Sequence, residues 1–346
     1  MVTTGYVIPV IINFCVPFDF ITMQDEIFLK FKFKQCEDLP TAMSDLQCAV
    51  IDDHVYVGGG TGEDKSDHKA QSQVFEYTLV RKRWVLLAHN PARYFGLTNF
   101  MGKLVSVGGI LTSNDITGNL SVFDFTEKTW KEDDKISPMP IKCFHPTVVA
   151  YGKCLAVCGG VTHGGSTTDM VEVLVDEQWH RGPQLPYRIC HAKHAIVDHS
   201  CYLLGGASSF KPSIPSNASI SIPLSFLMSD SGSQQAEFQP QCTWEEHRKY
   251  VYNSILYYTS QYYPTIANHG GILLIIGGCN QKLGVPTANI FAYSSEANIW
   301  IKVQELPEQL CSLAASTQLR NGAIMLVGGT DSKGKSARVF LMSRNI

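Results

Sequence analysis

The chain has 346 residues, of which 45% are hydrophobic and 17% charged, and its formal net charge is −3. This balance predicts a globular protein with a sizeable core, and it argues against a nucleic-acid partner, which would require a basic excess to neutralise phosphates. The eleven cysteines are odd in number and include no C-x-x-C pair. Neither a disulfide framework nor a zinc module is therefore indicated, and we expect a reducing, cytoplasmic location.

The N-terminal stretch MVTTGYVIPVIINFCVPFDFI is apolar but has no basic leader, and two prolines and an aspartate interrupt it. It resembles neither a secretory signal peptide nor a membrane-spanning helix, which needs about 20 apolar residues. We expect residues 1–24 to form a tucked or poorly ordered lead-in, and we expect no membrane association.

The first glycine-rich loop, HVYVGGGTGEDKS (residues 54–66), ends in Lys-Ser and invites comparison with nucleotide-binding loops. A phosphate-binding P-loop needs a glycine immediately before the lysine, where this chain has Asp64. The dinucleotide-binding fingerprint fails as well, because Glu63 takes its third glycine position. Two acidic side chains would also repel phosphate, so we predict no nucleotide cofactor.

The same apolar run ending in a glycine pair recurs along the chain. Its six copies are HVYVGGG, KLVSVGG, KCLAVCGG, SCYLLGG, GILLIIGG and AIMLVGG, at intervals of about 50 residues with one of about 72. One tryptophan follows each of the first five copies, and an alternating segment such as VFEY or VFDF precedes most of them. The tryptophans are Trp84, Trp130, Trp179, Trp244 and Trp300.

This periodicity predicts an all-β fold in which each repeat is a blade of four antiparallel strands. The glycine pair ends the second strand, which is apolar throughout because both of its faces are buried. The alternating segment is the third strand, and the fourth carries the tryptophan, which packs between blades. No single blade can bury both faces, so the repeats must close into a β-propeller.

The last repeat lacks its fourth strand, since ARVFLM is followed by the chain end without a tryptophan. The missing strand is present near the N-terminus, in EIFLKFKFKQCEDLP, where Phe33 lies seven residues before Pro40, as several tryptophans do before a proline. We therefore predict that a strand at about residues 27–36 completes the last blade. Residues 25–346 then form one six-bladed propeller, and joining both termini in one blade closes a ring that would otherwise have two open sheet edges.

Two segments depart from the repeat. The long fourth interval contains the strand-like ISIPLSFLM and a Ser/Gln-rich stretch, Ser229 to Gln241, and predicts a lengthened hairpin between the third and fourth strands. A further excess holds YVYNSILYY. In the sixth repeat, GTDSKGKS (residues 329–336) matches the full P-loop pattern, but a strand rather than a helix follows, so we interpret the match as a coincidence.

The glycine pair, the spaced aromatic residues, the tryptophan and the proline turn together resemble the kelch-repeat family of β-propellers, over residues 25–346. The resemblance implies protein recognition, commonly of a short peptide on one propeller face. Many kelch proteins serve ubiquitin ligases through a BTB domain that precedes the propeller, and about 24 residues are too few for one. We therefore expect a non-catalytic protein- or peptide-binding scaffold or adaptor, without a ligase role carried over.

Carried to this sequence, the turns that lead into each blade supply the candidate partner-binding residues. These turns combine a basic with an aromatic residue, which would suit an acidic peptide, since Arg and Tyr dominate binding hot spots. No catalytic, cofactor-binding or metal-binding residue is predicted. The candidates are Arg93, Tyr94, Lys142, His145, Arg188, His191, Tyr262 and Tyr263.

Enzymes on the same scaffold offer an alternative. Copper radical oxidases need a Tyr/Cys crosslink with histidine ligands, and no arrangement in this sequence selects such a set. Sialic-acid epimerases share the six-blade count and would need acid and base groups in the central pocket, for which Arg93, His145, Arg188 and His191 are available. Because these residues overlap the peptide-binding set, the sequence alone does not separate a binding module from a sugar-modifying enzyme.

Overall fold

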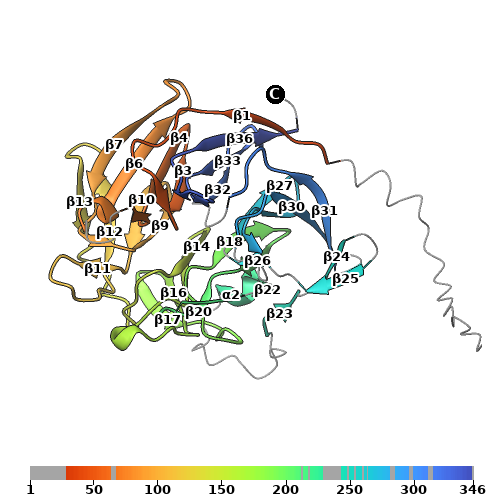
Figure 1. The fold of residues 1–346 in the computed structure, drawn as a ribbon. Coiled ribbons are helices and arrows are strands. Elements are labelled where there is room, and N and C mark those ends of the chain that lie inside the picture. Colours follow the sequence, from red (N-terminus) through yellow and green to blue (C-terminus); the bar gives the residue numbers. More distant parts are fainter. Residues whose placement is uncertain are drawn as a thin grey trace, which may run out of the picture.

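The computed structural model describes residues 29–63, 68–211, 213–216, 219–228, 243–247, 249–252, 255–258, 261–262, 264–280, 285–295, 299–310 and 315–344. Across these residues the long strands form six sheets in chain order, which we call blades 1 to 6 (Figure 1). The first strand of each blade contacts the first strands of its two neighbours, and these contacts run in a closed ring from blade 1 through blade 6 and back to blade 1. The fold is a six-bladed β-propeller, as the repeat predicts.

Each blade has four antiparallel strands, which we call A to D from the centre outward. Blades 1 to 3 consist of β3 (Gln47–Ile51), β4 (His54–Gly58), β6 (Gln73–Thr78) and β7 (Arg83–His89); β9 (Gly96–Phe100), β10 (Lys103–Val107), β12 (Leu120–Asp124) and β13 (Thr129–Glu132); and β14 (Thr147–Tyr151), β15 (Cys154–Cys158), β16 (Val171–Val175) and β17 (Gln178–Arg181).

Blades 4 to 6 follow the same plan. They consist of β18 (Lys193–Val197), β19 (Ser200–Leu204), β22 (Ser219–Pro223) and β23 (Glu245–Glu246); β27 (Thr265–His269), β28 (Ile272–Ile276), β30 (Asn289–Ser294) and β31 (Ile299–Glu305); and β32 (Ala315–Gln318), β33 (Ile324–Val327), β36 (Val339–Ser343) and β1 (Lys32–Gln35).

The N-terminal strand closes the ring, as predicted. β1 pairs antiparallel with β36. The two strands lie side by side in Figure 1, although their colours come from opposite ends of the colour bar. In this register Phe33 faces Met342, the last residue of VFLM. Trp84 faces Tyr77, the last residue of VFEY, so Phe33 takes the place of the tryptophan in blade 6.

The glycine pairs join neighbouring blades. Gly108 has φ +68°, and a Cβ on it would lie 2.5 Å from the carbonyl oxygen of Cys143 in the next blade's entry turn, so only glycine fits. Gly109 donates its N–H to that same carbonyl at 2.8 Å. The same backbone bond recurs from Gly160 to Ile189, from Gly278 to Leu310 and from Gly329 to Met43.

Blades 4 and 5 contain the irregular segments. The lengthened hairpin lies between β22 and β23, as expected, but ISIPLSFLM is not one strand, because β22 ends at Pro223 and α2 (Leu224–Leu227) follows. The Ser229–Gln241 stretch is outside the described residues. The YVYNSILYY segment forms β24 (Lys249–Tyr252) and β25 (Ile255–Tyr258), a hairpin whose β24 runs parallel to β31 and widens blade 5 to six strands.

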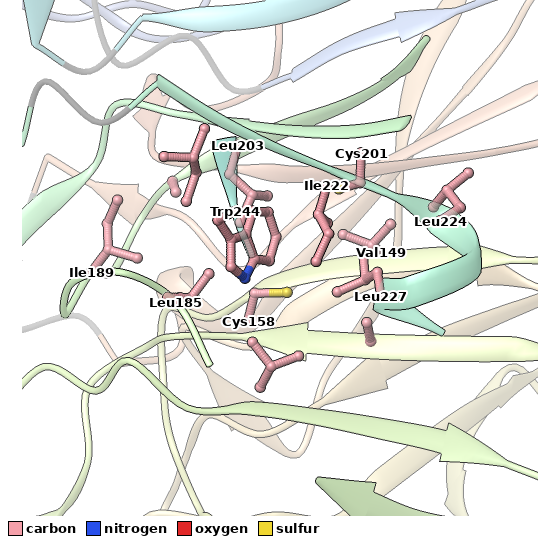
Figure 2. Close-up of a cluster of buried hydrophobic side chains, with 14 of the residues drawn as sticks. Val149, Cys158, Leu185, Ile189, Cys201, Leu203, Ile222, Leu224, Leu227 and Trp244 are labelled. Carbon is pink, nitrogen blue, oxygen red and sulfur yellow. The ribbon is translucent and has the colours of Figure 1, made fainter. Parts of the chain in front are cut away.

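The core lies between blades rather than within them. Figure 2 shows the cluster between blades 3 and 4, in which Trp244 packs with Leu203, Leu185 and Cys158. Its indole N–H donates to the carbonyl oxygen of Pro183 at 3.1 Å, in the segment that links the two blades. None of the helices in the described part of the chain has the length and hydropathy needed to cross a membrane.

Short two-stranded ribbons pair the turn entering a blade with its B–C loop in blades 1, 2 and 5, and single bridges, Phe144 to Val161 and Cys190 to Ala207, do so in blades 3 and 4. The ribbons are formed by β2 (Met43–Ser44) with β5 (Thr61–Gly62), β8 (Ala92–Arg93) with β11 (Ile110–Leu111), and β26 (Gln261–Tyr262) with β29 (Cys279–Asn280). Within the B–C loops themselves, β20 (Ala207–Ser209) pairs with β21 (Ile214–Pro215), and β34 (Thr330–Asp331) pairs with β35 (Gly334–Lys335). The entry turns and B–C loops therefore share one face of the propeller, and two 3₁₀ turns, η1 (Ala70–Ser72) and η2 (His163–Gly165), lie in these loops.

Candidate functional site

The residue two places before strand A adopts the left-handed conformation in four consecutive blades. These residues are Asp45, Tyr94, His145 and His191, with φ between 51° and 58°. This conformation is uncommon for residues other than glycine and is often found at functional sites. The backbone holds the turns against each other, because His145 donates its N–H to Tyr94 O at 2.8 Å and His191 donates to His145 O at 3.1 Å.

The side chains of this series stack in order around the ring. The ring centroids of Tyr94 and His145 are 4.3 Å apart, and those of His145 and His191 are 3.7 Å apart. Phe144 and Phe210 extend the stack, with centroids 5.2 Å apart in an edge-on arrangement. Three turns that are about 50 residues apart in sequence thus form one aromatic wall.

This wall borders a cavity of about 720 Å³ at the centre of the face formed by the entry turns and B–C loops. Its lining residues come from five of the six blades, which places the cavity over the central channel. They are Ser44, Asp45, Thr61, His68, Arg93, Tyr94, Ile110, Phe144, His145, His191, Phe210, Lys211, Ser213 and Lys335.

Cationic side chains outnumber acidic ones in this lining. Arg93, Lys211 and Lys335 contribute three permanent positive charges, whereas Asp45 is the one carboxylate among the lining residues. Lys335 is fixed by donating to the carbonyl oxygens of Thr61, at 2.9 Å, and Gly62. A cavity with aromatic walls and a positive potential suits an anionic group.

The two histidines in the wall are neutral near pH 7. Burial, with the nearby His191 and Lys193, holds the pKa of His145 well below its usual 6.5. Burial also lowers the pKa of His191, although Asp45 opposes that shift. Neutral imidazoles can donate or accept hydrogen bonds, and a bound anion would favour their protonated form.

Lys193 spans the central channel beside the cavity. It begins strand A of blade 4, and its ammonium group donates to Leu46 O in blade 1, on the opposite side of the ring, at 2.7 Å. Burial lowers its pKa, while Asp45 has the opposite effect. The lysine therefore bridges two blades on opposite sides of the ring.

Four of the eight sequence-predicted residues, Arg93, Tyr94, His145 and His191, line the central cavity together. Arg93 is 9% exposed, and its guanidinium donates to Leu111 O at 3.3 Å and to Asn114 Oδ1 at 2.8 Å, so it also fastens the loop beside the cavity.

Lys142 and Arg188 do not reach this cavity. Both are exposed and lie five places before strand A, on the outer part of the turn. Lys142 instead lines a separate cavity of about 520 Å³, with Leu111, Asp115 and His163 among its other residues. Tyr262 belongs to β26, which pairs with β29, and Tyr263 is outside the described residues.

Sequence reasoning missed several lining residues, among them Phe210, Lys211 and Lys335. Phe210 and Lys211 lie between β20 and β21, in the B–C loop of blade 4, a stretch that the sequence analysis assigned to the C–D insertion. Aligning each loop from its glycine pair would have placed SSFKPS with the other B–C loops. Asp45 could have been found by aligning the entry turns on strand A, because it precedes strand A by two residues as Tyr94 does.

Within the described ranges, no three His, Cys, Asp or Glu side chains are grouped so that they could hold a metal ion. No disulfide joins any two of the eight described cysteines. Burial raises the pKa of Cys143 and of Cys158 to about 12, which makes these thiols poor nucleophiles.

Comparisons with known proteins agree with this architecture. A family model described as "Kelch motif" matches residues 262–307, the segment from β26 to β31. Beta-scruin of Limulus polyphemus is 23% identical over 277 residues, which is 76% of this chain and 28% of that protein. The Vaccinia virus (strain Copenhagen) protein "Kelch repeat and BTB domain-containing protein 1" is 24% identical over 164 residues, 46% of this chain and 28% of that protein.

A solved structure, that of YjhT, matches with a TM-score of 0.65 and 14% identity, covering 87% of this chain and 94% of that chain. At this identity the likeness concerns the fold alone. The chain spans about a quarter of the length of the curated relatives that it matches.

Proposed function

Because the chain is a β-propeller of the kelch-repeat family, we propose that it is a non-catalytic module that binds a short acidic segment of another protein. The segment's acidic side chain would enter the central cavity. The observation that carries this proposal is the composition of the lining. It contains three cationic side chains and an aromatic wall but only one carboxylate. We include a cytoplasmic location in the proposal, which the buried free thiols support.

The size of the cavity fits this use. About 720 Å³ is within the range of sites that enclose a ligand of a few side chains. Tyr94 and Phe210, both partly exposed, offer flat apolar surface to the peptide, and Lys211 and Lys335 offer charge-assisted hydrogen bonds to a carboxylate. Lys142, which lines the separate cavity of about 520 Å³, would meet a second part of the same segment.

A library of random heptapeptides displayed on beads tests the proposal. We expect enrichment of Asp and Glu, and a loss of affinity when each acid in a selected peptide is replaced by its amide. In fluorescence polarisation, Lys211→Glu should weaken binding about tenfold or more, because it reverses a charge at the anion. Lys153→Glu makes the same charge change in the A–B turn of blade 3, remote from the lining, and should leave affinity within about twofold.

Enrichment of neutral or basic peptides would overturn the proposal, and so would equal weakening by the two variants. The sugar-modifying alternative needs an acid and a base facing each other across a bound sugar. His145 and His191 instead stack on the same wall, so we do not propose that activity. An anomer-exchange assay with N-acetylneuraminic acid should accordingly show no turnover above that of a Lys211→Glu, His191→Gln variant.

A further inference from the structure

The side chains that fill the space between neighbouring blades occupy equivalent places around the ring. The third residue of strand B in one blade meets residues from the end of strand C in the next. Between blades 1 and 2 these residues are Tyr56, Phe123 and Phe125. Their rings form a compact group, with Phe125 5.8 Å from Tyr56 and 5.0 Å from Phe123, centroid to centroid.

Between blades 2 and 3, smaller residues stand at the same three places. Val105 is the third residue of β10, and Leu174 and Asp176 correspond in register to Phe123 and Phe125. Three aromatic rings are thus replaced by a valine, a leucine and a carboxylate. Because the spacing of the blades is set by backbone bonds such as Gly109 N–H to Cys143 O, the sheets do not close over the missing volume.

Other interfaces compensate for small residues or keep large ones. Between blades 3 and 4, Ala156 is small, but Leu224 and Leu227 of α2 belong to the same buried cluster and add side-chain volume to it. Between blades 4 and 5, Tyr202 meets Tyr293 at 6.2 Å. Only the interface between blades 2 and 3, among those just compared, combines small residues with no inserted filler.

A cavity of about 550 Å³ occupies this place and opens on the face opposite the central cavity, among the A–B and C–D turns. Most of its lining is apolar, and Met101 at its mouth is 61% exposed. The lining residues are Phe100, Met101, Lys103, Val105, Leu120, Val122, Asp133, Ile136, Lys153, Leu174, Asp176 and Glu177.

We propose that the cavity between blades 2 and 3 binds an aromatic ring that carries a cationic group, as an arylalkylamine does. The ring occupies the volume that Phe123 and Phe125 fill one interface earlier, against Val105 and Leu174. A volume of this size is in the range of small-molecule sites. The site is separate from the central cavity and does not depend on the function proposed for it.

The charge of the ligand follows from the polar residues of the lining. Asp133, Asp176 and Glu177 contribute three carboxylates against the ammonium groups of Lys103 and Lys153. Among the described residues no salt bridge joins any of these five side chains to another. Asp133 Oδ1 accepts from Lys135 N at 3.1 Å, whereas Asp176 and Glu177 are exposed at the mouth and can meet a cationic ligand. The excess of one negative charge favours a cation over an anion of the same shape.

Titration with tryptamine, indole and indole-3-propionate tests the proposal, because the three probes share a ring and differ in charge. The protein carries ¹³C-methyl methionine, and the Met101 methyl signal, assigned with Met101→Leu, reports on the cavity. We expect tryptamine to shift this signal with a Kd of about 0.1–1 mM, as suits a ligand of this size. Indole should bind about two- to fivefold more weakly, and indole-3-propionate more weakly still. Met43, buried between blades 6 and 1, is the internal control.

Two variants make the test specific. Leu174→Phe combined with Asp176→Phe restores the aromatic group found between blades 1 and 2, and should abolish the tryptamine-dependent shift without lowering Tm. Asp176→Asn leaves the cavity open and should reduce the preference for tryptamine over indole by about two- to fivefold.

A failure of tryptamine to shift the Met101 signal at 5 mM would overturn the proposal. Unchanged binding by the folded double variant would also overturn it, as would tighter binding of indole-3-propionate than of tryptamine. If the double variant does not fold, Val105→Phe, which fills the cavity from blade 2, takes its place and has to abolish the shift.

Discussion

The interface between blades 3 and 4 and the interface between blades 5 and 6 join adjacent sheets with different side chains. In the first, Trp244 packs between the blades and its indole N–H donates to Pro183 O. In the second, Phe33 takes the place of the tryptophan, and its side chain has no N–H to donate. Instead the Gln304 side chain accepts from Phe31 N at 2.7 Å and donates to Phe31 O at 2.9 Å.

This difference follows from how each outer strand reaches its place. The outer strand of blade 4 is delivered by the chain that has just formed the same blade, whereas β1 arrives from the other end of the sequence. Backbone bonds to β36 fix one side of β1, and Gln304 on β31 fixes the residue just before it. β1 has no short covalent connection to its own blade, and the two hydrogen bonds between Gln304 and Phe31 hold it in place instead.

The largest effect is expected from removing residues 29–36. Leu29 and Phe31 are each less than 5% exposed. Their deletion exposes the apolar surface that they cover, together with the edge of β36. Each buried side chain of this size contributes about 1.5–3 kcal/mol, and net stabilities are about 5–15 kcal/mol. The truncated chain should lose its cooperative melt in circular dichroism and aggregate in size-exclusion chromatography.

Deletion of residues 1–24 is the control, since we propose that the propeller starts at about residue 25, and it should leave Tm within about 2 °C. A synthetic peptide of residues 25–40, added in trans, should restore the cooperative melt of the truncated chain. Retention of a wild-type melt without β1 would show that blade 6 needs no fourth strand.

Gln304→Ala should lower the free energy of unfolding by about 2 kcal/mol, because it leaves the half-buried N–H and C=O of Phe31 without partners. Gln184→Ala is the matched control. Its amide donates to Asp169 on the surface, so the loss should stay within about 0.5 kcal/mol. Urea denaturation of both variants gives the two values, and equal losses would contradict the role assigned to Gln304.

Acid should weaken the blade 4 side of the molecule more than the blade 5–6 interface. Burial and then Lys193 lower the pKa of His194 to about 4. The unfolded chain binds the proton more readily, so this contribution is complete above pH 6.5 and is lost as pH falls toward 4. We expect a loss on the order of 2 kcal/mol, allowing for the part of the ring that faces solvent.

His194→Gln should remove that pH dependence, measured by urea denaturation at pH 7 and pH 4.5. Burial also lowers the pKa of His269, which packs edge-on against Phe31 at 5.2 Å and is near Gly322 O. His269→Gln should therefore remove a smaller share of the acid loss. The comparison fails if the His269 variant flattens the pH profile more than the His194 variant.

The smallest effect concerns the indole N–H alone. Trp244→Phe removes the bond to Pro183 O and should cost about 1 kcal/mol beyond the loss of buried area. Trp300 is 1% exposed, and its indole N–H has no hydrogen-bond partner among the described residues. Trp300→Phe should cost about 1 kcal/mol less than Trp244→Phe, because it also removes a buried unpaired donor. Equal costs in urea denaturation would mean that the indole N–H contributes nothing at either place.

The fold was predictable from the sequence because its repeated residues have specific structural roles. A glycine pair recurs because each blade must receive the next blade's entry turn at contact distance, as Gly108 and Gly109 do for Cys143. Phe33 was recognisable because its spacing from Pro40 repeats that of the tryptophans, and the register confirms its place.

The candidate site was predictable only in part. Tyr94, His145 and His191 were found because they end proline-containing turns, whereas Lys142 and Arg188 were chosen as the basic residues of the same turns and do not line the cavity. Lys142 precedes His145 by three residues, as Arg188 precedes His191, yet only the histidines line the central cavity. Sequence spacing does not reveal which way each side chain of a turn points. The cavity between blades 2 and 3 had no sequence signal, because it depends on side-chain volume at three unmarked positions.

The pairing of β1 with β36 sets an order of events during protein synthesis. About 300 residues separate the two strands, and at about 5–20 residues per second their synthesis takes roughly 15–60 seconds. Throughout that time the first strand has no partner to pair with, and the other five blades can form around an open ring. β36 therefore leaves the ribosome long after β1, and the six blades become a closed ring only after translation has passed residue 343.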